Sequence, residues 1–475
     1  MLVKHRSFSD VRSKIIAMVE KGEYPSMAIA VAQGGKILWE EAFGWMNKDS
    51  KTKATPITIY PIASLSKSLT ATGMMVLVEQ KKVGLDDPVG EYIAPSRLTV
   101  YEGKASEVTV RRVLNMTSGI PHGYMVYKDP YSSLNLRKFI EQYGVVVFRP
   151  GDVELYSNFS YAVLELIIEN ITNASFADFM KTEVFDPLGM TQTSVGIPNS
   201  LKHAATKYQS NKVTIPHNYF VPAAAGGIYS SVHDLIRYAM FHLTNQLPYQ
   251  RQILRDKTLT TMHTAKDGNL ESAIMALGWG FVTLGDNTAW ILSNGGIEGA
   301  TSMLSLVPSA DLAVVCLTNV TSRSRITDQI AIEITDAFLP KFSDEVEIFM
   351  KHYESKNALK SYRPTPQLIG SWEGEIKAEA AETPIKITFH DNGRVDVRLG
   401  KHQETALTNA GFGNGQLKGD FRGASLSEDR VQNESTHTIS IHVKVEKSKM
   451  YGVATEEFEE NMGLLSPSYV CLHRI

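Results

Sequence analysis

The stretch "PIASLSKSLTATG", residues 61–73, decides the fold assignment of this chain. It places Ser64 three residues before Lys67, at the start of a segment with the apolar spacing of a helix. Residues three apart share one face of a helix, so a lysine amine there can accept the proton of a serine hydroxyl. The same spacing also describes a helix-capping serine and a solvated lysine. Taken alone, it favours that simpler interpretation, because such pairs occur by chance, as Ser50 and Lys53 show.

A second motif, Tyr156-Ser157-Asn158, precedes another helix-like run. In an extended loop, residues two apart project to the same side. The phenol of Tyr156 and the amide of Asn158 are therefore candidates for one pocket, as a proton shuttle and a hydrogen-bonding clamp. Alone, such a tripeptide is more often an ordinary loop with a packed tyrosine.

Composition narrows the function classes. The 43% hydrophobic and 21% charged residues are typical of a soluble globular protein, and the net charge of −3 gives no electrostatic footprint for nucleic acid. We therefore expect a small-molecule or peptide substrate. The chain has no H-E-x-x-H motif and no paired cysteine spacing, so we expect no catalytic metal and no cofactor. It also lacks the G-x-S-x-G motif of α/β-hydrolases. Cys316 and Cys471 are expected to be free thiols.

The first residues, "MLVKHRSFSDVRSK", have no apolar core of a signal peptide, and no apolar run is long enough to span a membrane. These features predict a cytoplasmic protein, unless a leader was removed from it.

The order of elements predicts an α+β fold for residues 1–345. Residues 27–44 indicate a β-hairpin around Gly34-Gly35, and residues 275–320 are β-like again. Helix-like segments separate them up to about residue 240. This order favours one antiparallel sheet closed by distant segments, with flanking helices and a helical subdomain.

The rest of the chain has a different pattern. Residues 346–366 are polar and contain proline, which indicates a linker. Residues 367–475 are expected to form an all-β domain, an up-and-down sheet or small barrel. Its strands are marked by alternating apolar residues: Ile385, Ile387 and Phe389, then Val395, Val397 and Leu399 after a turn, and later Ile439, Ile441, Val443 and Val445.

Taken together, these motifs resemble the superfamily of serine β-lactamases and penicillin-binding proteins. The resemblance is to its class C β-lactamase-like branch, which includes D-stereospecific peptidases, family VIII esterases and penicillin-binding-protein-type thioesterases. It covers about residues 10–340 and is carried, in the family's order, by "IASLSKSLTATGMMVLVEQKKVGLDDPV", "VTVRRVLNMTSGIPHG", "FRPGDVELYSNFSYAVLELI", "FDPLGMTQTSV", "AAAGGIYSSVHDLIRYA" and "LSNGGIEGATSM".

The resemblance implies a role for each residue of the first two motifs. Ser64 is the nucleophile that becomes acylated, and Lys67 accepts its proton or holds the proton network. Tyr156 shuttles protons, while Asn158 orients Lys67 and the substrate. Whether Lys67 or Tyr156 is the base stays open at this point.

The third family motif departs from its usual form. Aligned through its glycines, "SNGGIEG" puts Ser293 where the family has a cationic residue, followed by Asn294 and Gly295 as substrate-binding positions. By resemblance, the backbone N–H groups of Gly296 and Ser64 form the oxyanion hole. Ser293 carries no charge to bind a substrate carboxylate, which disfavours a β-lactamase or cell-wall carboxypeptidase. Substrates without a carboxylate near the scissile bond, such as amides, esters or thioesters, are favoured instead.

Two further features bear on the pocket. "QLIGSWEGEI", with Gly370 and Trp372, resembles the opening of lipocalin-like barrels, so the C-terminal domain is expected to be lipocalin-like and to gate the pocket or stabilise a dimer. His122 either lines the pocket mouth or lies on a surface loop, and we favour the surface loop.

The function predicted from these features is a serine hydrolase or acyltransferase that acts on peptides or amides, as a D-aminopeptidase or amidase does. The alternatives are a family VIII-type carboxylesterase or transesterase with weak or no β-lactamase activity, and a catalytically silent sensor or scaffold. The intact set of four motif residues speaks against the silent homologue. The sequence leaves open the acyl acceptor, the stereochemical preference and a homo-oligomeric state.

Overall fold

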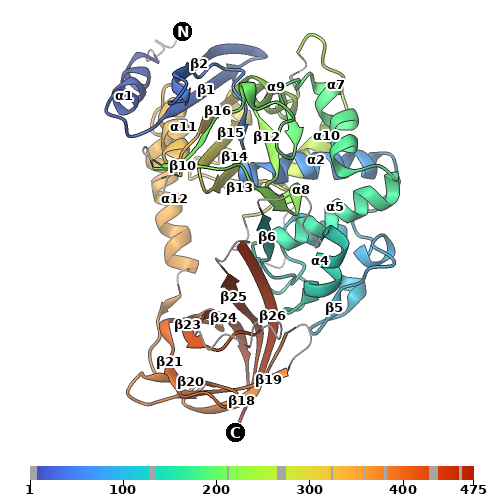
Figure 1. Cartoon of the computed structure of the whole chain (residues 1–475), viewed down its shortest axis with the longest axis vertical. Coiled ribbons are helices and arrows are strands. Elements are labelled where there is room, and N and C mark those ends of the chain that lie inside the picture. The colour runs from blue at the N-terminus through green and yellow to red at the C-terminus, as the bar shows by residue number, and fades with distance from the viewer. Residues whose placement is uncertain are drawn as a thin grey trace.

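The computed structural model describes residues 8–127, 135–210, 213–245, 247–264, 274–321, 325–357, 359–378, 382–426, 437–458 and 463–475. Its N-terminal part is built on a seven-stranded antiparallel sheet that distant segments close, as predicted (Figure 1). The predicted hairpin and the late β-like region meet at its centre, with Ala30 opposite Val315. In spatial order the strands are β13 (Gly280–Thr283), β14 (Ala289–Ile297), β15 (Ala300–Val307), β16 (Leu312–Thr318), β1 (Ser26–Gln33), β2 (Lys36–Asn47) and β3 (Thr52–Lys53).

Both faces of this sheet are buried, and strand β1 shows why its sequence is apolar throughout. Met27, Ile29 and Val31 pack into one hydrophobic cluster, whereas Ala28 and Ala30 belong to another. This alternation follows from the two-residue repeat of a strand. On the methionine side lie helices α1 (Ser9–Glu20), α11 (Ile326–Asp336) and α12 (Phe342–Asn357).

The alanine side of the sheet faces the helical block that the sequence predicts between the two β-like regions (Figure 1). None of the helices in the described residues is long and apolar enough to cross a membrane. The helices of this block are α2 (Ser66–Glu79), α3 (Val110–Leu114), α4 (Leu136–Tyr143), α5 (Asn158–Thr172), α6 (Phe176–Met180), α7 (Asp186–Leu188), α8 (Ala223–Gly226), α9 (Val232–His242) and α10 (Asp256–Thr264).

Short strands connect the helical block to the sheet and to the rest of the molecule. They are β4 (Tyr60–Pro61), β12 (Ile228–Ser230) and β8 (Ser194–Val195) in one ribbon, β5 (Thr99–Val100) parallel to β7 (Val145–Val146), β6 (Tyr124–Tyr127) beside β11 (Tyr219–Val221), and β9 (Lys207–Ser210) beside β10 (Val213–Ile215).

The C-terminal part is an antiparallel half-barrel of ten strands, which confirms the all-β prediction (Figure 1). The alternating apolar residues predicted to face its interior are all buried in one cluster with Trp372. Along the sheet the strands are β17 (Lys360–Ser361), β22 (Thr408–Gly413), β23 (Gln416–Gly423), β24 (His437–Glu446), β25 (Lys449–Phe458), β26 (Gly463–Arg474), β18 (Gly370–Lys377), β19 (Glu382–Phe389), β20 (Val395–Leu399) and β21 (Thr405–Ala406).

The segment predicted as a linker, residues 346–366, differs from the expectation. Helix α12 occupies its first part, and β17 already pairs with β22 of the half-barrel. Phe342 and Val346 bury one side of α12 against the cluster beneath the large sheet. The many charged residues of this segment lie around that narrow apolar stripe. For this reason the sequence pattern predicts a polar linker, although the segment begins with an amphipathic helix.

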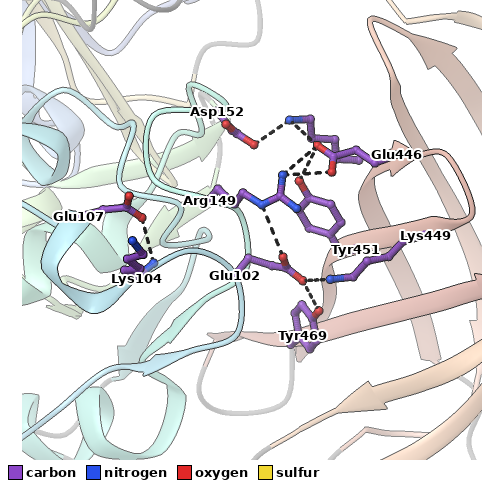
Figure 2. A network of polar contacts seen from close by, with 10 residues as sticks. Glu102, Lys104, Glu107, Arg149, Asp152, Glu446, Lys449, Tyr451 and Tyr469 are labelled. Carbon is purple, nitrogen blue, oxygen red and sulfur yellow. Dashed lines mark hydrogen bonds and ion pairs between the residues drawn. The ribbon is translucent and has the colours of Figure 1, made fainter.

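The half-barrel is joined to the N-terminal part by backbone pairing and by side chains. Residues 463–465 of β26 pair with residues 124–126 of β6. Figure 2 shows the polar network nearby, in which the buried carboxylate of Glu102 accepts hydrogen bonds from Lys449 and from Tyr469 (2.6 Å). Arg149 pairs with Glu446 at 3.1 Å, and Asp152 pairs with Lys444 at 2.7 Å.

Apolar contacts fill the same interface. Phe148 packs in one cluster with Tyr451 and Tyr469, and the ring of Tyr469 stacks on Tyr101 with centroids 4.3 Å apart. Such contacts bury apolar area from both parts of the chain, so the half-barrel packs against the N-terminal part and is not a loosely attached tail.

Candidate active site

The two motifs of the sequence meet in one site. Ser64 lies in the short 3₁₀ turn Ala63–Leu65 directly before α2, and Tyr156 lies in the loop before α5. The Oγ of Ser64 is 2.6 Å from the hydroxyl of Tyr156 and 3.2 Å from Nζ of Lys67. Ser50 and Lys53, which have the same spacing in the sequence, do not form such a site. Ser50 is exposed, and its hydroxyl bonds to Thr52.

The backbone before the nucleophile is held in an uncommon conformation. Ala63 has a φ of +49°, in the left-handed region that costs a non-glycine residue on the order of 1–2 kcal/mol. This turn directs Ser64 outward at the N-terminal end of α2, where backbone N–H groups have no helical carbonyl partner. The helix start therefore provides donors for a developing negative charge.

Lys67 is only 3% exposed, and its surroundings determine its charge. Its Nζ donates to the carbonyl of Ala225 (2.8 Å), and the rings of Tyr156 and Tyr161 lie 4.9 and 5.5 Å away. Burial lowers the pKa of Lys67 well below its usual value, since an ammonium loses its hydration there. A neutral Lys67 amine can donate to Ala225 and still accept the proton of Ser64.

The hydroxyl of Tyr156 is the other group that can transfer a proton to or from Ser64. Desolvation raises the pKa of Tyr156, while the hydrogen bond with Ser64 lowers it, and the net direction is upward. The residue as a whole is 45% exposed, so substrate can reach it. At neutral pH Tyr156 is therefore a phenol that donates to Ser64, while Lys67 is the better acceptor.

Asn158 is the first residue of α5, and its side chain is buried. Among the described residues its Oδ1 has no hydrogen-bond partner, so it is not bonded to Lys67 in the way the resemblance implies. A buried amide oxygen without a donor is costly. A substrate N–H group that enters the site is therefore a suitable partner for Asn158.

His122 is placed differently from the favoured expectation of a surface loop. The ring is half-buried, lies 5.3 Å from the ring of Tyr156, and accepts the backbone N–H of Asn158 on Nδ1 (3.2 Å). Burial is the main cause that lowers the pKa of His122 to about 4. It is thus a neutral wall of the site. The sequence offers this position only as the less favoured alternative, because the contact of His122 with Asn158 depends on how its loop packs against the start of α5.

Strand β14 carries the third motif along the edge of the site. A Cβ on Gly295 would lie 2.7 Å from the backbone nitrogen of Ser64, so only glycine allows the strand to pass this close. Ser293, two residues earlier on the same face, is buried and brings no charge. The side chain of Asn294 turns to α11 and donates to Asp328 (2.9 Å). The oxyanion role of Gly296 and Ser64 stays a prediction.

The comparison with known families agrees with this geometry. The family model described as Beta-lactamase matches residues 11–337. The chain belongs to the β-lactamase family. Its N-terminal part thus has the fold of the family's serine hydrolases, which include β-lactamases and penicillin-binding proteins.

Three similar proteins show how far this β-lactamase-family chain matches others. It is 26% identical over 330 residues to Protein flp of Staphylococcus aureus (strain NCTC 8325 / PS 47), covering 67% of this chain and 65% of that one. The octameric penicillin-binding protein homologue from Pyrococcus abyssi has a TM-score of 0.61 at 21% identity, covering 97% of this chain and 100% of the homologue. EstCE1, a hydrolase with promiscuous acyltransferase activity, has a TM-score of 0.56 at 18% identity, and the match covers 70% of this chain and 97% of EstCE1.

These three similarities support different conclusions about the chain. The chain spans less than two thirds of the length of the curated relative, so that protein's activity is not transferred as a finding. The two solved structures show the fold alone. The match to the Pyrococcus homologue extends over almost the whole chain and so includes the half-barrel.

Proposed function

We propose that this protein is a serine hydrolase or acyltransferase that forms an acyl-enzyme on Ser64 and acts on peptide or amide substrates. The observation that carries the proposal is the hydrogen-bonded row Tyr156–Ser64–Lys67–Ala225 carbonyl, with a buried lysine whose neutral form is favoured. Such a row moves a proton away from the serine hydroxyl at the moment when its oxygen attacks a carbonyl carbon.

In the proposed reaction Lys67 Nζ takes the proton of Ser64, and Oγ bonds to the substrate carbonyl carbon. The oxyanion then lies at the N–H groups of Ser64 and Gly296. Collapse of this intermediate breaks the bond to the leaving amine or alkoxide, which receives the proton of the Tyr156 hydroxyl. Water or another acceptor later attacks the acyl-enzyme by the reverse sequence. The unpartnered Oδ1 of Asn158 favours an acyl group with an amide N–H.

A carboxylesterase or transesterase on the same machinery is the second candidate. It is supported by Ser293, which brings no charge to the position where the resemblance implies a cation. A silent sensor is disfavoured, since nothing in such a protein requires an uncharged buried lysine beside an aligned serine. The octameric Pyrococcus homologue supports a homo-oligomer as a further proposal, which light scattering of the purified protein tests.

The deciding experiment is intact-mass spectrometry after exposure to a D-aminoacyl amide, a short-chain aryl ester and a penicillin, with turnover of each followed. We expect an acyl adduct that Ser64→Ala abolishes, and rate losses of about 10²–10⁴ for Lys67→Met or Tyr156→Phe. Ser50→Ala is the matched control and leaves the rate unchanged. Full activity of Ser64→Ala would refute the proposal.

A further inference from the structure

A chamber lies between elements that also form the site around Ser64. It has a volume of about 250 Å³ and is walled by the β6–β11 ribbon, the glycines after Ala225, and Ile297 at the end of β14. Ala225 holds Lys67, and Ile297 follows Gly296, so elements of the catalytic site also wall the chamber. A substrate bound at Ser64 can therefore extend into it.

Lys207 lines this chamber and is a buried cation without an anionic partner. The side chain is 2% exposed, donates to the carbonyl of Pro216 (3.1 Å), and forms no ion pair with any residue that the structure describes. Glu298 is the acid that acts on it electrostatically, and Glu298 is exposed. A buried ammonium is costly unless it is paired, which makes an unpaired one a candidate binding group.

The charge of Lys207 is preserved at neutral pH. Burial lowers the pKa of Lys207 only to about 8, so the ammonium form prevails below that pH. Glu165 is an acid in the chamber wall, but it does not cancel this charge. Burial raises the pKa of Glu165 to about 8, and its Oε2 accepts the backbone N–H of Ala224 (2.8 Å). The chamber therefore offers one positive group and a neutral acid.

Asn218 gives a second, independent indication of a ligand. It also lines the chamber, and its Oδ1 is buried without a hydrogen-bond partner among the described residues. This oxygen can accept an N–H group. A ligand with an anionic group for Lys207 and an amide N–H for Asn218 satisfies both residues.

We propose that the chamber binds the anionic end of the acyl substrate, with Lys207 on its carboxylate and Asn218 on a neighbouring amide N–H. The substrates are then amides or esters whose acyl part carries a carboxylate away from the scissile bond, and not in the position of Ser293. Lys207 packs against Gly299 in the turn between β14 and β15, so its ammonium lies beyond the end of the strand that carries Gly296. This inference rests on the proposed acyl-enzyme at Ser64.

The test uses p-nitrophenyl half-esters of glutaric, adipic, suberic and sebacic acids, each compared with its methyl ester. We expect the full-length protein to prefer the free acid by about 10- to 100-fold in kcat/KM at the longer chain lengths, since a charge-assisted contact is gained. Lys207→Met keeps the stem that packs on Gly299 and should bring this ratio close to one. Lys202→Met, a neighbouring exposed lysine, is the control that keeps the ratio.

Folding gives an independent reading of the same variant. Removal of a buried, unpaired charge should leave the Tm of Lys207→Met unchanged or raise it, as expected for a residue kept for binding. Lys207→Gln repeats the ratio measurement if the methionine variant misfolds. A wild type without preference for the free acid, or a Lys207 variant that keeps it, overturns the inference while p-nitrophenyl butyrate still acylates Ser64. Absence of acylation by every ester would instead reject the proposed function and this inference together.

Discussion

Lys67 and Tyr156 have shifted pKa values that assign them different roles. Burial favours the neutral amine of Lys67, and the net shift favours the neutral phenol of Tyr156. The ambiguity over the base is a property of the motif alone. The surroundings favour Lys67 as the proton acceptor of the proposed reaction, because desolvation lowers the pKa of an amine and raises that of a phenol, so both groups are held neutral.

The pH dependence of acylation follows from this assignment. The neutral fraction of Lys67 rises with pH, so kcat/KM for a neutral aryl ester should rise and level off below the ordinary lysine value of about 10.4. It should decline only above the usual tyrosine value of about 10, because the pKa of Tyr156 is raised and its phenol keeps the proton to higher pH. Stopped-flow acylation between pH 5 and 11 measures the profile. A rise that continues past pH 10 would assign the base to tyrosinate.

Glu165 gives a stability prediction of its own. Its pKa is raised by burial to about 8, so the folded state holds a proton that the unfolded chain releases near 4.3. The folded state is therefore progressively destabilised as pH rises from about 4 to 8. Glu165→Gln abolishes this pH dependence. Relative to the wild type, its free energy of unfolding should therefore be higher at pH 8 than at pH 5 by on the order of a few kcal/mol. Urea unfolding at both pH values measures it, with Glu20→Gln, a change of an exposed glutamate, as the control.

At the scale of elements, strand β14 determines which substrates can be held beside Ser64. Ser293 is buried and uncharged, and it stands where the resemblance implies a cation that binds the substrate carboxylate. Penicillins and cephalosporins should therefore be turned over slowly or not at all. A missing charge-assisted hydrogen bond is worth roughly 1.5–3 kcal/mol. Ser293→Lys or Ser293→His should raise the rate of β-lactam acylation relative to ester cleavage, as measured by intact mass over time. Efficient lactam hydrolysis by the wild type would contradict this account.

The elements also show what a sequence can predict. The central hairpin, the helix after Ser64 and the alternating strands of the half-barrel follow from local patterns, since each pattern directly records which face is buried. The sequence of helix α12 predicts a linker instead of a helix, because the apolar stripe of this helix is narrow. The contact of Ala225 with Lys67 and the position of His122 depend on packing between elements far apart in sequence, which no local pattern records.

On the scale of the whole molecule, the half-barrel supports one wall of the chamber that we propose binds the substrate. Strand β26 holds β6, and the β6–β11 ribbon contributes Tyr127, Tyr219 and Phe220 to the chamber wall. A chain cut after residue 366 exposes Phe148 and leaves one edge of β6 unpaired. A point variant therefore tests this coupling more cleanly than a deletion.

Glu102→Gln is that variant. It removes the buried charge that Lys449 and Tyr469 share and should lower the free energy of unfolding by about 1–3 kcal/mol in urea titration. Glu107→Gln is the matched control on the same loop, since its carboxylate accepts the N–H of Lys104 within the N-terminal part (Figure 2). We also expect Glu102→Gln to weaken selection between long and short acyl esters. Unchanged stability and selection would mean that the interface only joins the two parts.

The pairing of β26 with β6 also has a temporal consequence. A ribosome makes Ser64, Lys67 and Tyr156 long before residues 463–465, and at 5–20 residues per second the interval after Tyr156 is roughly 15–60 s. During synthesis the nascent protein thus carries a nucleophile beside an unfinished wall. Its open strand edge is a natural binding place for a chaperone. The wall that β26 supports is complete only after residues 463–465 have been made, so in the proposed enzyme the ability to form an acyl-enzyme precedes its selectivity.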